Sequence, residues 1–159
     1  MNKFVTNLLL AGCWAALSGS FSVFSLLVGF VLGFLILWLL QPLIGGAPGY
    51  FLRTYHWIRL IVMFHYELIV SSLSVVWDIV TPRHRAKPDV IEVPLDVTTD
   101  AGILLVTNLI SLTPGTLSLD VAPDRKTLLV HAMFAEDPDK IRNDLKNGME
   151  RWVKEAVET

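Results

Sequence analysis

The chain has 159 residues, of which 53% are hydrophobic and 18% are charged, and its formal net charge is −2. Residues 1–80 hold three Lys/Arg and two Asp/Glu, a net of +1, whereas residues 81–159 hold ten and thirteen, a net of −3. Neither half is basic enough for a nucleic-acid-binding protein. The division indicates a lipid-embedded first half and an aqueous second half.

Catalytic and metal-binding signatures are not found. Cys13 is the only cysteine, which excludes an intramolecular disulfide and a cysteine-cluster zinc or iron–sulfur site. The sequence has no glycine-rich nucleotide motif, no HExxH and no nucleophile elbow. We therefore expect no cofactor and no enzymatic activity.

Residues 21–40, FSVFSLLVGFVLGFLILWLL, form an uncharged apolar run. A helix of twenty residues is about 30 Å long, which matches the hydrocarbon core of a bilayer. The residues from Pro88 onward are too few to bury such a helix inside a water-soluble domain. This run predicts an integral membrane protein.

Residues 1–17 are also apolar and are followed by a turn signal at Ser18-Gly19-Ser20. The preferred interpretation is a short first helix, that turn, and a second helix from Phe21 to about Pro42. Together, residues 1–42 would form a transmembrane hairpin. A signal peptide is the alternative, but its cleavage would leave a very short segment before the next apolar run.

Small residues recur at intervals of four in both predicted helices. Gly29 and Gly33 form a GxxxG motif that Ser25 extends, and Gly12 and Ala16 repeat the spacing in the first helix. Such residues lie on one helix face and allow two backbones to approach closely in lipid. We expect them to pack within the hairpin or against another subunit, although glycine is also simply common in membrane helices.

Residues 50–80 predict a third, long helix with a narrow polar stripe on a wide apolar surface. This helix could lie in the membrane interface, or it could span with the stripe facing protein. We favour a steeply tilted or spanning helix packed against other membrane protein. The stripe consists of Arg53, His56, Glu67, Ser71, Ser74 and Asp78.

Arg59, His65 and Glu67 are the candidate intramembrane polar residues. An ionisable residue within a membrane helix is a candidate for an ion or proton path. Because one carboxylate does not form a path, the simpler interpretation is that Glu67 lies near the interface or pairs with a neighbour such as Arg59 or a partner's lysine. Residues 81–88, TPRHRAKP, form a basic linker that the positive-inside rule places in the cytoplasm. The side of the N-terminus then depends on whether residues 50–80 span.

Residues 89–159 predict a cytoplasmic α/β domain of order β-α-β-β-α, so the fold class is two to three membrane helices plus this small domain. Pro94 suggests that the first strand lies at a sheet edge. The helix over 101–112 is largely apolar and is expected to be buried. The predicted elements are a strand over 90–96, a helix over 101–112 capped by 98–100, strands over 116–122 and 127–134 joined by a hairpin turn, and a last helix from 137 to about 157.

Thr113, Pro114 and Gly115 stop the predicted helix and turn the chain. One hypothesis is that this turn sets the angle between the buried helix and the central strand, and so fixes the docking surface of the domain. An ordinary helix stop is an equally good interpretation.

The run NLISLTPGTLSLDVAPDRKTLLVHAM, from Asn108 to Met133, resembles the E subunit of the multi-subunit Mrp-type monovalent cation/proton antiporters. That family is also similar in its N-terminal hairpin with a glycine-spaced second helix, here VGFVLGF. Its third helix likewise begins with Pro-Gly and an aromatic residue, here Pro48-Gly49-Tyr50, and carries Arg59 and Glu67 eight residues apart. The likeness covers essentially the whole chain.

The resemblance implies an accessory subunit of a bacterial cell-membrane complex that exchanges Na⁺, or in some cases K⁺, for protons and supports salt tolerance and cytoplasmic pH. The ion routes would belong mainly to larger subunits, while this subunit would serve assembly and stability. Its partners would be other membrane subunits and the lipid bilayer, with no nucleic acid. Two alternatives are a free-standing membrane-anchored adaptor or sensor, and a small independent transporter.

Overall fold

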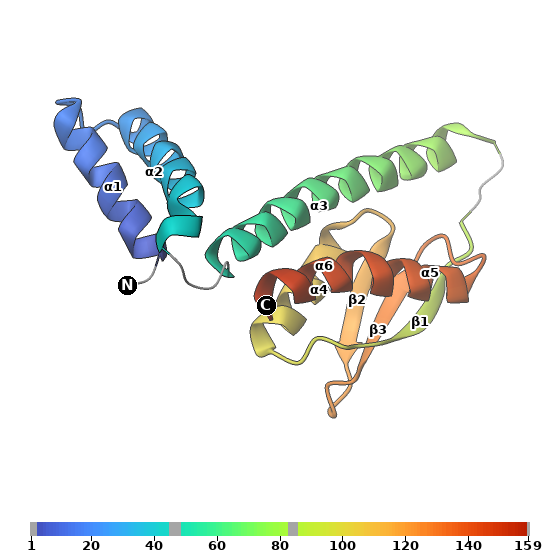
Figure 1. Cartoon of the computed structure of the whole chain (residues 1–159). Helices are drawn as coiled ribbons and strands as arrows, with labels where there is room; N and C mark the ends of the chain where they lie inside the picture. Colours follow the sequence, from blue (N-terminus) through green and yellow to red (C-terminus); the bar gives the residue numbers. More distant parts are fainter. Residues whose placement is uncertain (1–2, 45–48, 83–85, 159) are drawn as a thin grey trace. The chain divides into compact units, whose positions relative to one another are not determined.

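The computed structural model describes residues 3–44, 49–82 and 86–158. The chain divides into two compact units, residues 1–52 and residues 53–159, which are described in turn. Figure 1 shows the helices and strands in chain order.

A helical hairpin forms the first unit, from α1 (Lys3–Leu17) and α2 (Val23–Ile44). The expected turn is present, and Gly19 adopts a φ of +65°, which a glycine tolerates without strain. Ser18 and Ser25 are hydrogen-bonded through their hydroxyl oxygens at 2.9 Å, so the turn is also joined to the first turns of α2.

Both ends of α2 differ slightly from the prediction. The helix begins at Val23 because the Ser22 hydroxyl accepts a hydrogen bond from the Ser25 backbone N–H at 3.1 Å, which makes Ser22 the capping residue. The predicted end near Pro42 is wrong by two residues, since Pro42 lies inside the helix. Its fixed φ is compatible with a helix, and it removes only one amide donor in the last turn.

The third helix, α3 (Gly49–Val80), has 32 residues and begins in the first unit and continues in the second. In the described part of the chain, two helical segments are long and apolar enough to cross a membrane by length and composition, Val23–Leu43 and Gly49–Val80. The shorter α1 has 15 residues.

The rest of the second unit is a small α/β domain built on three strands, β1 (Asp89–Pro94), β2 (Thr116–Val121) and β3 (Thr127–Ala132). All pairings are antiparallel and the spatial order is β1-β3-β2. The first strand therefore lies at an edge, where Pro94 has no donor to lose. Figure 1 shows the C-terminal helices crossing one face of this sheet.

The domain core follows the alternation of its strands. Val93, Leu128 and Val130 point from the sheet toward Val106 of α4 (Asp100–Leu112) and Val153 of the last helix, and all are at least 98% buried. The other face of α4 is open: Leu104 and Leu112 are 64% and 61% exposed. The expectation of a buried helix over 101–112 is therefore correct for one face only, because the sheet covers a single side.

The last helix is not continuous as predicted. It consists of α5 (Pro138–Leu145), a π-helical turn η1 (Lys146–Glu150) and α6 (Arg151–Val157). A π-turn adds a residue to the helical turn. Met149 and Glu150, adjacent in sequence, are both buried. Apolar N-terminal helices followed by a small α/β domain agree with the predicted fold class at this level.

Candidate functional site

The hairpin contact is built on the small residues of α2. Ser25, Gly29, Gly33 and Leu37 are all buried, at intervals of four residues. A Cβ on Gly29 would lie 2.8 Å from the Trp14 Cβ and 3.0 Å from the Ala11 backbone. The two helices thus approach so closely at this point that only glycine fits.

The facing residues of α1 differ from those predicted. Asn7, Ala11 and Ala15 are the buried residues of α1, with exposed fractions of 0 to 3%. A Cβ added at Gly12 would have none of the described atoms within 4 Å, and Ala16 is exposed. For the hairpin contact, the predicted pair Gly12 and Ala16 is therefore displaced by one position. The sequence did contain the signal, because Asn7, Ala11 and Ala15 share the same spacing of four.

Asn7 joins α1 to the first turn of α3. Its side-chain Nδ2 donates a hydrogen bond to the Tyr50 hydroxyl at 3.1 Å, while Oδ1 has no hydrogen-bond partner among the described residues. A Cβ on Gly33 would lie 2.3 Å from that Oδ1, so the amide rests directly on the α2 backbone. Aromatic contacts surround this junction: Phe4 with Phe30 and Tyr50, and Phe34 with Tyr50 and Phe51.

Within the second unit, a charged contact joins α3 to α6. The Arg59 Nη1 donates to the Glu155 Oε2 at 2.6 Å, and the His56 Nδ1 lies 3.5 Å from the same oxygen. Arg151 donates to the other carboxylate oxygen of Glu155 at 2.9 Å. Leu60 of α3 is 3% exposed and belongs to the hydrophobic core of the domain. The hydrogen bond from Arg151, together with the charges of Arg59 and Arg151, holds the pKa of Glu155 below its usual value despite partial burial.

No pattern in the sequence indicated this contact, and Arg59 was only one possible partner of Glu67. Glu155 is 96 residues away, and no local pattern indicates such a pairing. Glu67 lies two turns beyond Leu60 on the same face of α3 and is half-buried. Asp78 lies on that face too and is 3% exposed.

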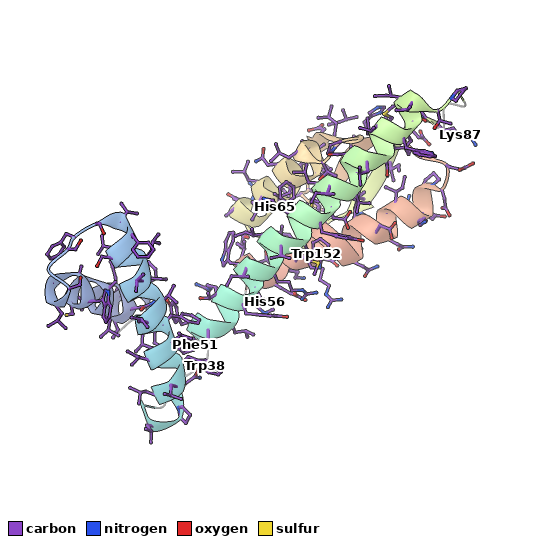
Figure 2. All side chains as sticks on the ribbon, turned by 90° about the horizontal axis from the view of Figure 1, so that it is seen from above. Trp38, Phe51, His56, His65, Lys87 and Trp152 are labelled. Carbon is purple, nitrogen blue, oxygen red and sulfur yellow. The ribbon has the colours of Figure 1, made fainter. Side chains whose placement is uncertain are left out.

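The opposite face of α3 is apolar and exposed. His65 lies there, and its Nδ1 is 2.7 Å from the Ile61 carbonyl oxygen of its own helix. Figure 2 shows His56 near the start of α3 and His65 further along it. The exposed apolar residues of this face include Ile58, Ile61, Val62, Tyr66, Ile69, Val76 and Val80.

Two carboxylates of the last helical segment hold the connection between β1 and α4. Glu150, which is 3% exposed, accepts the backbone N–H of Asp96 and that of Val97. Glu158 accepts the backbone N–H groups of Thr98 and Thr99 at 2.7 and 2.9 Å. Burial raises the pKa of Glu158, but these hydrogen bonds outweigh it and the pKa is lowered.

The turn over residues 113–115 closes α4 onto the sheet. Gly115 has a φ of +92°, and its carbonyl oxygen accepts the Met133 backbone N–H at 2.8 Å. The Thr116 hydroxyl donates to the Ile110 carbonyl oxygen at 2.7 Å and so satisfies the end of the helix. Pro114 is half-buried within this turn. The strand that follows is β2, which pairs with the central strand β3.

The remaining predicted residues lie at the helix end nearby. Thr113 is buried and its hydroxyl donates to the Leu109 carbonyl oxygen at 2.9 Å. Asn108 is exposed and its Nδ2 donates to the Leu104 carbonyl oxygen at 2.8 Å. Of the predicted basic linker, residues 83–85 lie outside the described residues. Among the described residues, no group of three or more His, Cys, Asp or Glu could hold a metal ion.

The fold and these contacts define a class of protein in which long apolar helices are joined to a small α/β domain. The chain belongs to the family described as Na⁺/H⁺ ion antiporter subunit, whose model matches residues 7–156. The resemblance found at Asn108 to Met133 is thereby confirmed.

Individual relatives agree over nearly their whole length. The chain is 32% identical to the E1 subunit of the Na⁺/H⁺ antiporter of Staphylococcus haemolyticus (strain JCSC1435), over 98% of both chains. It is 32% identical to the E subunit of the Na⁺/H⁺ antiporter of Alkalihalophilus pseudofirmus, also over 98% of both chains. The corresponding E subunit of Bacillus subtilis (strain 168) is 31% identical over 97% of both.

Two solved structures contain chains that are similar in fold to this one. A chain in the structure of the Mrp complex from Dietzia sp. DQ12-45-1b is 26% identical, with a TM-score of 0.50, and the match covers 61% of this chain and 91% of that one. A chain of the membrane-bound sulfane sulfur reductase, an archaeal respiratory membrane complex, shares the fold over 100% of both chains, with a TM-score of 0.56 and 20% identity.

Proposed function

We propose that this protein is an accessory membrane subunit of a multi-subunit Na⁺/H⁺ antiporter and that it contributes to assembly and stability rather than carrying the ion path. The observation that carries the proposal is the family match over residues 7–156, with relatives named as antiporter E subunits that align end to end. The likeness to a chain of the Mrp complex supports membership of a large assembly.

The polar residues of α3 support a structural role. Arg59 is engaged by Glu155 of the α/β domain, and His65 bonds to its own helix. Glu67 has no second carboxylate on the same face until the buried Asp78, three turns further along. A proton path needs closely spaced relay groups. Arg59 instead serves to hold α3 against the domain.

The distribution of side chains on α3 supports an interfacial position for this helix in place of the spanning position favoured from the sequence. Leu60, Glu67 and Asp78 share the face that lies toward the α/β domain, and the opposite face exposes large apolar side chains. A helix with one face on a water-soluble domain and the other apolar suits the membrane surface. The basic residues of the 81–88 linker support a cytoplasmic position for the domain.

The test is to purify the tagged full-length protein from gently solubilised membranes of a host that expresses the whole antiporter. We expect it to migrate on a native gel in an assembly of a few hundred kilodaltons with large polytopic subunits. Migration alone, or as a small homo-oligomer, would reject the proposal and favour a free-standing membrane-anchored adaptor.

A further inference from the structure

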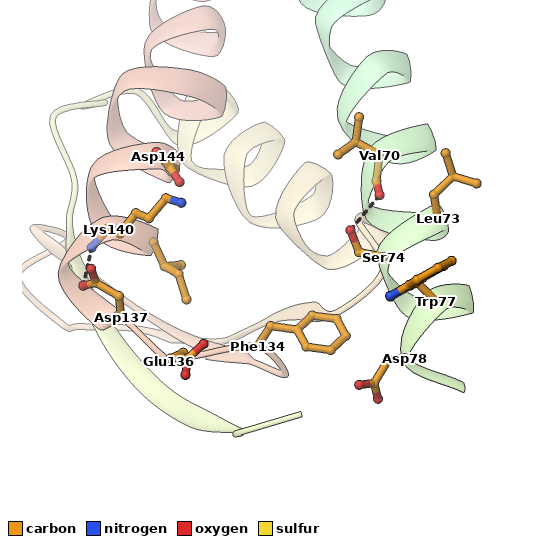
Figure 3. Close-up of a pocket in the computed structure, with 11 residues that line it drawn as sticks. Val70, Leu73, Ser74, Trp77, Asp78, Phe134, Glu136, Asp137, Lys140 and Asp144 are labelled. Atoms are coloured by element: carbon orange, nitrogen blue, oxygen red, sulfur yellow. Dashed lines mark hydrogen bonds between the residues drawn. The ribbon is translucent and has the colours of Figure 1, made fainter. Parts of the chain in front are cut away.

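Asn7 is a polar side chain buried inside an otherwise apolar helical hairpin. Its exposed fraction is 0%, its Nδ2 donates to the Tyr50 hydroxyl at 3.1 Å, and its Oδ1 lies against the Gly33 backbone. Polar side chains of the second unit can be satisfied by water: Asp137 and Lys140 are exposed and line an open cavity of about 1060 Å³ (Figure 3). Asn7 has no such access, so the free energy of its amide depends on the protein groups that contact it.

Two faces of α1 carry residues small enough to pack closely against α2. The observed face contains Ala11 and Ala15. A rotation of α1 by one residue, about 100°, would put Gly12 and Ala16 in their places. Small residues at a spacing of four allow two helices in lipid to approach closely, and both pairs satisfy this condition. The size of the side chains at the points of close approach therefore does not select the observed face.

We propose that Asn7 selects which face of α1 packs against α2. In the observed packing, the amide of Asn7 is bonded to Tyr50 and covered by Gly33. The rotation by one residue would move Asn7 to the half-exposed position that Thr6 holds. It would break the hydrogen bond to Tyr50 and expose the amide to lipid, where no water replaces the lost partner. The observed face is therefore the one that satisfies the amide.

The hydrogen bond between the Ser18 and Ser25 hydroxyls is the other polar contact of the hairpin. Ser18 follows the last residue of α1, Leu17, so this bond restricts the turn more than the rotation of the helix. Asn7 lies within α1 and near its opposite end, so its contacts restrict the rotation of the helix directly.

Cysteine cross-linking distinguishes the two packings. Gly29 lies against the Ala11 backbone, so the common spacing of four places Ser25 opposite Ala15. The pair Ala15→Cys and Ser25→Cys therefore reports the observed packing, and the pair Ala16→Cys and Ser25→Cys reports the rotated one. The full-length protein is reconstituted in phospholipid bilayers and oxidised, and mass spectrometry gives the ratio of the first disulfide yield to the second. Both pairs are made in a Cys13→Ser background, which removes the only native cysteine.

The decisive variant is Asn7→Ala, which removes the amide but keeps a side chain that fits against Gly33. We expect it to lower the cross-linking ratio about tenfold, the effect of one hydrogen bond between helices in lipid. Tyr50→Phe should also lower the ratio, but not in the Asn7→Ala background, because both changes remove the same bond. Leu9→Ala, at a 57% exposed position of the same helix, is the matched control and should leave the ratio unchanged.

Three results would overturn this role of Asn7. The first is equal yields of the two disulfides while Asn7 is present. The second is a ratio that Asn7→Ala leaves unchanged, or lowers no more than Leu9→Ala does; the turn and the aromatic contacts would then fix the face. The third is a further fall when Tyr50→Phe is added to Asn7→Ala. Since these measurements use this chain alone, their failure leaves the proposed function, which co-purification tests, unaffected.

Discussion

The hairpin and the α/β domain use opposite kinds of contact. The hairpin brings two helices together on Gly29, Gly33 and Ala11, with no large side chain between the backbones at those points. The domain buries Leu128, Val130 and Val153 completely. In lipid, an apolar side chain gains little by leaving its surroundings, so close backbone approach must provide the contact. In water, burial of apolar surface provides most of the stabilisation.

Truncation of a large side chain should therefore be most damaging in the domain. Leu128→Ala removes a completely buried side chain from the central strand, and we expect it to destabilise the protein by about 3 kcal/mol. Thermal and denaturant unfolding of the full-length protein in detergent measures this change. Leu104→Ala, at a 64% exposed position, is the control and should change stability little.

Enlargement should be the damaging change in the hairpin. Gly33→Val places its Cβ 2.3 Å from the Asn7 Oδ1, and we expect about 2 kcal/mol of destabilisation and reduced recovery of the complex. Gly12→Val is the matched control, since a Cβ there has no atom of the described residues within 4 Å. If both variants unfold at the wild-type temperature, the close approach of the two helices has been misassigned. A loss of assembly for Gly12→Val alone would instead place a partner subunit at that position.

The α/β domain also contains a position that requires glycine, Gly115, because its φ is positive. Gly115→Val forces a branched side chain into a φ of +92°, and we expect a cost of about 2 kcal/mol. If the turn also fixes a docking surface, recovery of the complex should fall more than stability alone explains. Thr107→Val, on the neighbouring helix, introduces the same side chain at a position without a positive φ and serves as the comparison. Normal assembly together with a normal melting temperature would refute the hypothesis for this turn.

The contact between α3 and α6 should have a smaller effect. A double-mutant cycle with Arg59→Gln and Glu155→Gln should give a coupling of about 1 kcal/mol, because both side chains are about one-quarter exposed. Unfolding by urea provides the four free energies. A coupling of zero would mean that Leu60 and its apolar neighbours alone hold α3 to the domain.

Lowering the pH should produce the most gradual loss of folding stability. The pKa values of Asp96, Glu155 and Glu158 are lowered from 3.8, 4.5 and 4.5, so the unfolded state binds protons first as the pH falls. Their contribution to stability is complete well above pH 5 and is lost as the pH falls through the lowered values. Melting temperatures at successive pH values measure it. Glu158→Gln should flatten the profile relative to Glu92→Gln, an exposed control.

Local signals in the sequence predicted much of this architecture, because they depend on neighbouring residues. The turn at Gly19, the cap at Thr99 and the hairpin before Thr127 all lie where turn and capping residues indicated. The contact of α1 with α2 uses Asn7, Ala11 and Ala15, one position away from Gly12 and Ala16, because two sets of residues in that helix share the spacing of four. Only the geometry of the α1–α2 pair shows which of the two sets faces α2.

Long-range pairing could not be predicted in the same way. Nothing near Arg59 indicates Glu155, and nothing near Asp96 indicates Glu150, because these contacts depend on how the domain closes. The π-turn in the last helix was also missed. The apolar spacing of that segment fits a regular α-helix nearly as well, so periodicity alone could not reveal the additional residue.

The carboxylate contacts of Glu150 and Glu158 have a consequence for the order of events during synthesis. The β1–α4 connection is made early, yet the groups that satisfy its backbone amides lie 53 to 60 residues later in the chain. Translation must therefore proceed well past β3 before the first strand of the domain can be completed. The contacts between α1 and α2 lie within residues 3–44, so the membrane anchor is ready to insert before the domain that it carries can fold.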